Sequence, residues 1–368
     1  MFTLLPESVC ANDKVVIQMI SKKLSFFKFI FNIFCEGIKI LKKYKLYVRN
    51  NRINCGKSVV AVSLHRKKKM SLSVTQTQSI PQTLIRNFTE ITKFRLSVSV
   101  VFSSVAGYLL GAETIDYYVL LLLCVGGYCM VGASNVYNQI IERDLDALMD
   151  RTKDRPIPAG RIGVSSAFVL AIVLTVVGLL VLYSINPITA MFGAISIFLY
   201  VSLYTPLKTK TPLSVFIGAF PGAIPFMLGW VAATNSFGIE PGTLFMVQFF
   251  WQFPHFWAIG WFLYEDYQKG GFFMLPTGKR DKGTAVQVVL YSIWTVLTSL
   301  IPAFGVTGKL YLTPVSAVII GLLGIGLLYY AFRLYKEKTN KAAKQLMLAS
   351  VSYITLLQVV YVLDKFIR

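Results

Sequence analysis

Residues 117–150 read YYVLLLLCVGGYCMVGASNVYNQIIERDLDALMD. This stretch is mostly apolar as far as residue 141 and strongly charged after it. A helix needs about 20 apolar residues to cross the hydrocarbon core of a bilayer. The stretch therefore predicts a membrane-spanning helix that carries acidic side chains out of one side of the membrane.

The rest of the chain repeats this pattern of long apolar segments. Of the 368 residues, 55% are hydrophobic and 15% are charged, and the mean hydropathy is +0.60. Soluble proteins carry about 25% charged residues, so lipid is the expected solvent. We predict an all-α integral membrane protein with nine transmembrane helices. The nine windows are residues 96–111, 117–141, 164–185, 187–205, 213–234, 243–264, 284–304, 313–335 and 345–363.

The basic residues are distributed unequally among the loops. Sixteen Lys and Arg residues lie in or beside the loops after the second, fourth, sixth and eighth windows, whereas the other four loops hold one, Lys309. Basic loops stay on the cytoplasmic side of a membrane. The net charge of +20 thus indicates membrane orientation, and no nucleic-acid partner. We expect the N-terminus and the basic loops to face the cytoplasm or the mitochondrial matrix.

The first 85 residues are predicted to be a basic N-terminal extension, ahead of a membrane domain at residues 86–368. Residues 1–70 hold 15 Lys and Arg residues and three acidic ones. The extension could contain an amphipathic surface helix at 24–47, belong to a targeting segment, or be an over-long start before initiation at Met70. The expected location is the cell inner (plasma) membrane, with the mitochondrial inner membrane as the alternative.

Polar side chains recur every fourth residue where the second window ends. Asn138, Glu142, Asp146 and Asp150 would lie on one face of a continuous helix, where like charges repel unless a cation neutralises them. Such oxygen ligands suit Mg²⁺, which keeps positions for water and substrate phosphates. A solvated loop is the plainer interpretation, but acidic residues inside a membrane span are usually functional. Four cations that could bind a phosphate follow: Arg143, Arg151, Lys153 and Arg155.

Two further segments lie on the same predicted side of the membrane. The loop YTPLKTKT at 204–211 supplies a phenol and two ammonium groups in Tyr204, Lys208 and Lys210. Alone it is typical of a basic loop, but beside an acidic metal site it predicts a diphosphate-binding loop. Glu265 and Asp266 leave the sixth window as a second acidic pair.

The sixth window also holds an aromatic segment, WQFPHFW at 251–257. His255 is the one histidine that falls inside a predicted span. A lone histidine there is usually a hydrogen-bonded part of the core, but the surrounding rings suit a flat aromatic ligand. Pro221 and Pro225 in the fifth window predict a broken or kinked helix that lines a cavity.

These motifs resemble those of a known family. The pattern N-x₃-E-x₃-D that starts at Asn138 is similar to the first Asp-rich motif of the UbiA-type intramembrane prenyltransferases, although Glu142 stands where the family often has Asp. The loop 204–208 resembles the next motif of that family. WQFPHFW, followed by Glu265 and Asp266, resembles the branch that modifies heme. The resemblance covers roughly residues 85–368 and implies nine helices around a central cavity.

The resemblance also implies an activity. The protein would be a transferase that moves the farnesyl group of farnesyl diphosphate to a vinyl group of heme B, giving heme O and diphosphate. Mg²⁺ would be the cofactor and heme B a substrate; other partners would be the lipid bilayer and downstream heme-modifying or terminal oxidase assembly proteins. The implied Mg²⁺ ligands are Asn138, Glu142, Asp146, Asp150 and Asp266, and the first three are also the implied catalytic residues. The implied substrate-binding residues are Arg143, Arg151, Lys153, Arg155, Tyr204, Lys208, Lys210, His255 and Trp257.

Two other functions are open at this point. The same family also prenylates quinone precursors, although the aromatic segment around His255 favours heme. A secondary transporter is the non-enzyme alternative, because transporters also carry charges within the membrane. The charges here cluster at one membrane face and no internal repeat is visible, which favours the enzyme.

Overall fold

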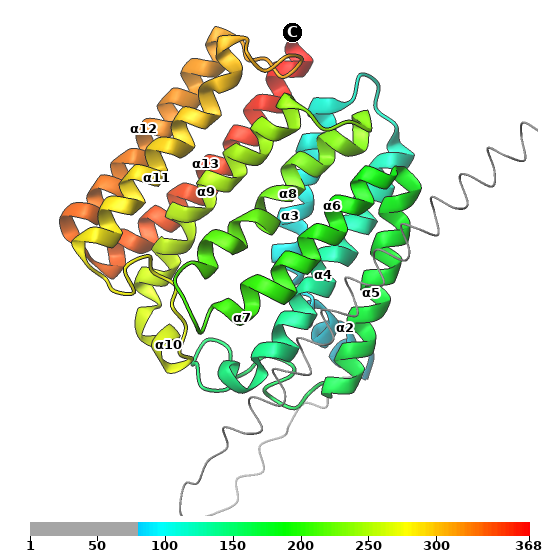
Figure 1. The fold of residues 1–368 in the computed structure, drawn as a ribbon, viewed down its shortest axis with the longest axis vertical. Helices are drawn as coiled ribbons and strands as arrows, with labels where there is room; N and C mark the ends of the chain where they lie inside the picture. Colours follow the sequence, from blue (N-terminus) through cyan, green and yellow to red (C-terminus); the bar gives the residue numbers. More distant parts are fainter. Residues whose placement is uncertain (1–79) are drawn as a thin grey trace, which may run out of the picture. The chain divides into compact units, whose positions relative to one another are not determined.

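Helices make up most of residues 80–368, the part of the chain that the computed structural model describes (Figure 1). This part contains no β-strand, and Ile85–Arg368 forms one compact unit. The surface helix, the targeting segment and the start at Met70 lie outside the described residues. The helices are α2 (Ile80–Ile91), α3 (Phe94–Gly111), α4 (Tyr117–Asp146), α5 (Val164–Ile185), α6 (Pro187–Phe198), the π-helix η1 (Leu199–Tyr204), α7 (Thr205–Leu207), α8 (Ser214–Thr234), α9 (Ile239–Phe262), α10 (Tyr264–Lys269), α11 (Lys282–Leu300), the 3₁₀-helix η2 (Ile301–Phe304), α12 (Pro314–Glu337) and α13 (Asn340–Ile367).

Each of the nine predicted windows coincides with a long helical segment. Within the described residues, eight segments are long and apolar enough to cross a membrane, with Pro187–Leu207 counted as one. The ninth is α9, whose 24 residues extend for roughly 36 Å but include the polar Gln248, Gln252 and His255. The predicted all-α membrane fold is confirmed. We count α9 as the ninth long helix because of its length and because it packs against α8, α11 and α13.

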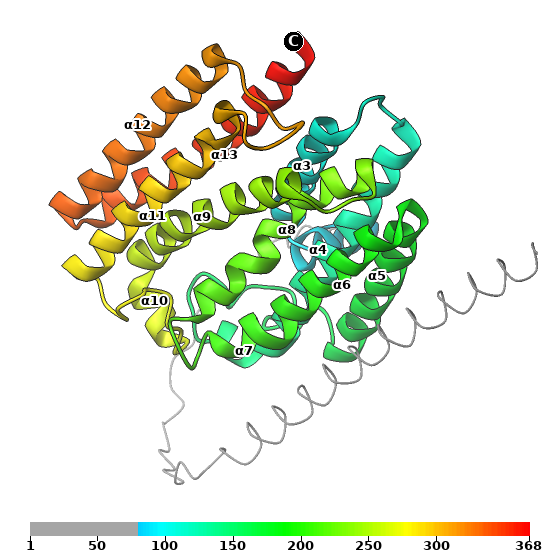
Figure 2. The ribbon, with the colours of Figure 1, turned by 45° about the horizontal axis from the view of Figure 1, so that its top comes forward.

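α8 lies at the centre of the bundle, packed against α3, α6 and α9 (Figures 1 and 2). In its span 72% of the residues are buried, against 28–50% in the other seven candidate spans. On one side of it α4 and α5 pack as a pair, and on the other α9, α11, α12 and α13 pack together. A helix that is apolar on all sides, as α8 is, suits this central position.

The two prolines of α8 do not break the helix. The predicted break is wrong, because α8 is continuous from Ser214 to Thr234. The alternative, a kink, stays a prediction, whereas the predicted cavity beside this helix is present and is lined by Phe220, Ile224 and Met227. Pro225 has no N–H to donate to the carbonyl of Pro221, four residues earlier. The hydroxyl of Ser196, on α6, donates to that carbonyl instead, at 3.3 Å. A neighbouring helix thus satisfies the backbone group that the proline leaves free.

α3 and α8 cross at close range because glycines line their contact. A Cβ added at Gly229 would lie 1.9 Å from the carbonyl oxygen of Ser104, and one added at Gly107 would lie 2.0 Å from that of Phe226. Small residues allow helix backbones in membranes to approach one another in this way. The two glycines therefore set the distance between α3 and the central helix.

The segments that carry the predicted site residues lie at the same end of the bundle. The C-terminal end of α4, α7 and α10 gather there, whereas the chain's C-terminus lies at the opposite end (Figure 1). This arrangement agrees with the alternation of charge among the loops, and it brings the acidic and basic motifs within reach of one another.

Gly229→Ala should destabilise the protein. The added methyl group would collide with backbone atoms, which cannot swing aside as a side chain can, so we expect a loss of about 1–3 kcal/mol and a lower melting temperature in detergent. Gly321→Ala on α12 is the matched control, because nothing lies within 4 Å of its added Cβ. Equal melting temperatures for Gly229→Ala and the wild type would contradict the close crossing.

Candidate active site

Three polar side chains share one face of the last turns of α4. Asn138, Glu142 and Asp146 are 1%, 3% and 0% exposed, and the spacing of four residues points them in the same direction. The amide of Asn138 lies 3.4 Å from the hydroxyl of Thr205. The predicted column of four is three residues long, because α4 ends at Asp146 and Asp150 lies beyond it, exposed.

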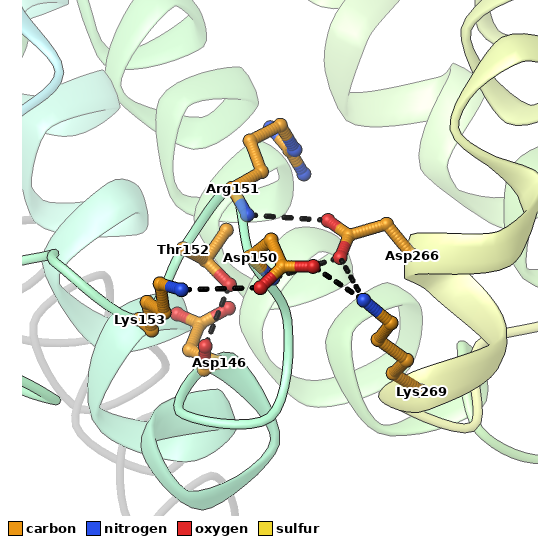
Figure 3. Close-up of polar contacts among 7 residues, drawn as sticks. All are labelled: Asp146, Asp150, Arg151, Thr152, Lys153, Asp266 and Lys269. Carbon is orange, nitrogen blue, oxygen red and sulfur yellow. Dashed lines mark hydrogen bonds and ion pairs between the residues drawn. The ribbon is translucent and has the colours of Figure 1, made fainter.

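α4 ends at this point because side chains outside the helix take over its backbone hydrogen bonds (Figure 3). The hydroxyl of Thr152 donates to the carbonyl of Asp146 at 2.8 Å. The carboxylate of Asp266 accepts the backbone N–H groups of Asp150, at 2.7 Å, and Arg151, at 3.3 Å. Asp266 thus holds the loop after α4 against α10. Metal binding by Asp150 and Asp266 stays a prediction.

Each buried carboxylate faces its own cation. Nη1 of Arg155 lies 2.6 Å from Oδ2 of Asp146, and Nζ of Lys208 lies 2.8 Å from Oε1 of Glu142. Burial acts to lower the pKa of Lys208, but the Glu142 carboxylate together with Tyr200 and Tyr267 outweighs it, so this pKa lies above its usual value. The Lys208 ammonium also lies over the ring of Tyr204, 4.5 Å from its centroid.

Lys93 belongs to the same charged cluster, although the sequence analysis missed it. It links α2 to α3 in the left-handed conformation, with a φ of 49°, which is uncommon for a residue other than glycine. Burial lowers the pKa of Lys93 to about 7, helped by Arg155 and Lys208, while Glu142 and Asp146 act in the opposite direction. The signal that could have found Lys93 is its position just before the first window, on the basic side of the membrane.

The remaining predicted cations are more exposed than Arg155 and Lys208. The predicted Lys153 pairs with the carboxylate of Asp150, as does Lys269, which the sequence analysis did not predict (Figure 3). Hydrogen bonds from these two ammonium groups lower the pKa of Asp150. The guanidinium of Arg151 lies over the ring of Tyr267, 5.5 Å from its centroid. Two further predicted cations, Arg143 and Lys210, are half-buried and exposed, respectively.

His255 and Trp257 lie on different sides of α9. His255 faces α13, where its Nδ1 lies 2.9 Å from Oγ of Ser350, and its ring stacks on Trp251 with 4.9 Å between the centroids. Trp257 packs against Tyr291 of α11, with 5.0 Å between the ring centroids, and is buried. The structure does not bring these two predicted substrate-binding residues together, and both roles stay predictions.

The end of α4 has a donor set that fits a magnesium ion. Oδ1 of Asp146 is buried and has no hydrogen-bond partner, which is unusual for a buried polar atom. Among the residues that the structure describes, no three His, Cys, Asp or Glu side chains come together as a metal site. Two carboxylates, from Glu142 and Asp146, with the amide oxygen of Asn138 are nevertheless suited to Mg²⁺, which keeps several waters or phosphate oxygens among its ligands.

Known relatives match most of the chain. Residues 100–355 match the UbiA prenyltransferase family. A protein of Christiangramia forsetii named protoheme IX farnesyltransferase is 74% identical over 297 residues, which cover 81% of this chain and 99% of the relative. A protein of the same name from Flavobacterium psychrophilum is 69% identical over 290 residues, which cover 78% of this chain and 97% of the relative.

Solved structures share the fold. A structure of digeranylgeranylglyceryl phosphate synthase has a TM-score of 0.65 at 19% identity and covers 77% of this chain and 98% of its own. A UbiA homolog from Archaeoglobus fulgidus bound to GPP and Mg²⁺ has a TM-score of 0.54 at 16% identity and covers 75% of this chain and 99% of its own. With the family matched over residues 100–355, the chain belongs to the UbiA prenyltransferase family.

Proposed function

We propose that this protein transfers the farnesyl group of farnesyl diphosphate to a vinyl group of heme B, giving heme O and diphosphate. The observation that carries the proposal is the pair of buried carboxylates, Glu142 and Asp146, each matched with a cation at one end of a membrane bundle. The name of the relative that is 74% identical, protoheme IX farnesyltransferase, supports heme as the acceptor.

Asn138, Glu142 and Asp146 are the residues that would hold Mg²⁺. When bound, Mg²⁺ neutralises negative charge on the leaving diphosphate. The GPP and Mg²⁺ bound to the Archaeoglobus fulgidus homolog support Mg²⁺ as the ion. With their carboxylate partners engaged as ligands, Lys208 and Arg155 become available to bind phosphate oxygens.

Lys208 and Arg155 then act on the diphosphate as cations, and Lys93 becomes the third because the negative charge of a bound diphosphate favours its protonated form. Lys208 and Arg155 pair with the two carboxylates, and Lys93 is electrostatically coupled to both pairs. The bond between the first farnesyl carbon and oxygen breaks with its electron pair leaving on the diphosphate. Fixed cations stabilise this growing charge more strongly than they stabilise the intact substrate, and the buried setting strengthens them further.

The farnesyl cation has to avoid water until it meets heme, and the apolar bundle provides that shelter. The π electrons of the vinyl group form the new carbon–carbon bond. Water then adds to the resulting cation and releases a proton, which leaves the hydroxyl group of heme O. We propose His255 and Trp257 as residues that contact the heme ring. His255 is half-buried and Trp257 is fully buried, so His255 is the more accessible of the two to heme.

We infer that the site opens on the cytoplasmic side of a bacterial inner membrane, with the mitochondrial inner membrane as the alternative. The concentration of Lys and Arg in the loops at the charged end supports this orientation. Downstream heme-modifying or oxidase assembly proteins would receive the product, and this transfer to partner proteins stays a prediction.

Asp146→Asn should reduce heme O formation about a hundredfold or more, because an amide neither neutralises a cation nor pairs with Arg155. The assay is mass spectrometry of heme extracted after incubation with farnesyl diphosphate and heme B. Asp144→Asn is the matched control, since this carboxylate is exposed and should be dispensable. Full activity of Asp146→Asn would rule out the site. If the wild type, supplied with both heme B and 4-hydroxybenzoate, forms prenylated 4-hydroxybenzoate and no heme O, heme is ruled out as the acceptor.

Removal of divalent cations should stop the reaction reversibly. EDTA is expected to abolish heme O formation, and excess MgCl₂ should restore it, because the two carboxylates can then bind the ion again. Calcium should restore less activity, since it prefers longer bonds and more ligands than Mg²⁺. An unchanged melting temperature in EDTA is the control for folding, and undiminished turnover in EDTA would contradict the assignment.

Lys93→Met should raise the KM for farnesyl diphosphate about ten- to a hundredfold, through loss of a charge-assisted hydrogen bond of about 1.5–3 kcal/mol. Lys93→Arg keeps the positive charge and should recover part of the affinity. The KM for heme B should not change in either variant. Lys341→Met, on the exposed start of α13, is the matched control. If the KM of Lys93→Met for farnesyl diphosphate equals that of the wild type, Lys93 is not part of the site.

A further inference from the structure

The turn between α2 and α3 has a strained backbone. Thr92 and Lys93 form this turn, and Lys93 has a φ of 49°, in the left-handed region that residues other than glycine avoid. Strained conformations persist only where the surrounding structure holds them, and they are common at functional sites. The contacts that hold this turn therefore bear on what Lys93 does.

Polar side chains hold the backbone of the turn. Nε2 of Gln139 donates to the carbonyl of Ile91 at 2.8 Å, and Nδ2 of Asn135 donates to the carbonyl of Thr92 at 3.2 Å. The hydroxyl of Ser97 donates to the same Thr92 carbonyl at 2.8 Å. The last carbonyls of a helix have no partner within it, so these side chains supply the hydrogen bonds that α2 lacks at its end.

Tyr128, two turns before Asn135 on α4, adds a further contact. Its hydroxyl lies 3.0 Å from that of Thr92. The Thr92 hydroxyl donates its one proton to the carbonyl of Phe88, at 2.8 Å, so Tyr128 is the donor in this pair. We call Tyr128, Asn135 and Gln139 the α4 clamp. Asn135 and Gln139 are 2% and 0% exposed, so water does not compete for their hydrogen bonds.

The α4 clamp lies on the same face of α4 as the acidic residues of the site. Asn135 and Glu142 are seven residues apart, and Gln139 and Asp146 are also seven apart, which places all four on one side of the helix. Gln139 and Glu142 are separated by roughly 4.5 Å along the helix axis. Both carboxylates act electrostatically on Lys93, in the direction that favours its charged form. A single helix therefore sets the position of the turn relative to the carboxylates.

We propose that Asn135 and Gln139 are positioning residues, which hold the strained turn and so keep the Lys93 ammonium where the diphosphate group of the prenyl donor binds. The inference rests on the proposed function for the role of Lys93. A lysine side chain has many rotamers, so the region that its ammonium reaches depends on a fixed backbone. Without the two amides the turn would relax, and the ammonium would leave the site.

The test is a double-mutant cycle on the binding of farnesyl thiodiphosphate, an unreactive analogue, to the full chain in nanodiscs with Mg²⁺. Gln139→Met keeps the length of the side chain but removes its donor, and it should weaken binding about tenfold. Beside Lys93→Met, the same substitution should change the affinity by less than about twofold, because its effect passes through the lysine. Asn135→Leu should behave in the same way. Equal weakening in both backgrounds would overturn the proposal.

Gln358→Met is the matched control for the loss of a buried amide. Gln358 of α13 is 1% exposed, and its Nε2 donates to the side chains of Ser103 and Gln248 at 3.0 and 3.2 Å. Its replacement should lower the melting temperature and leave the affinity for the thiodiphosphate unchanged. If Gln139→Met does not fold, Ser97→Ala is the milder variant. It should weaken binding about two- to tenfold, and only where Lys93 is present.

Two substitutions at Lys93 test the strain. Lys93→Ala and Lys93→Gly both remove the ammonium and should weaken thiodiphosphate binding equally. Glycine adopts a positive φ without a steric penalty, so Lys93→Gly should melt about 2–4 °C above Lys93→Ala. Equal melting temperatures would overturn the proposal, because the α4 clamp would then hold no strain.

These measurements separate the inference from the proposed function. If the wild type forms no heme O but Gln139→Met acts through Lys93, the heme acceptor fails and the α4 clamp stands. If the wild type forms heme O and Gln139→Met weakens binding equally in both backgrounds, the inference alone fails. Wild-type affinity in Lys93→Met would overturn both the role of Lys93 and the inference.

Discussion

Two carboxylates enclosed in a membrane bundle impose a constraint on which much of this structure depends. Glu142 and Asp146 are buried at the end of α4, and a buried charge that loses its partner destabilises a protein by about 3–5 kcal/mol. Each carboxylate is matched by a cation from outside α4. Glu142 pairs with Lys208, which follows α7, and Asp146 pairs with Arg155, which lies in the loop after α4. Meeting this requirement draws separate segments of the chain to one point.

The loops around the carboxylates are held by hydrogen bonds to the backbone. Asp266 accepts two N–H groups of the loop after α4, so the segment after the sixth predicted window is tied to the segment after the second. The N–H of Phe273 donates to the carbonyl of Lys208 at 2.8 Å, which joins the segment after α10 to the lysine of the site. The three motifs therefore form one preorganised unit, and disturbance of one is expected to be felt at the others.

The packing of the bundle complements this charged end. The glycines of α3 and α8 bring their backbones together, and an apolar cavity lies between α8 and its neighbours α6 and α9. A ligand with a charged head and an apolar tail matches both regions. The fold thus separates a charged end of the bundle from an apolar interior.

The sequence by itself determined the membrane class, the positions of the nine long helices and the type of chemistry. These follow from local properties, because apolar length, loop charge and a spacing of four residues need no knowledge of distant contacts. It predicted Asn138, Glu142 and Asp146 as one helix face, but it extended that face to Asp150, because the hydrogen bonds that end α4 come from Thr152 and from the distant Asp266.

Only the tertiary structure decided which cation serves which carboxylate, added Lys93 to the site and separated His255 from Trp257. It also showed that α8 continues through Pro221 and Pro225, since the hydroxyl that satisfies the freed carbonyl belongs to α6. These features depend on contacts between segments far apart in the chain. A single sequence carries the chemical groups for such contacts but not their partners, which the packing of the helices selects.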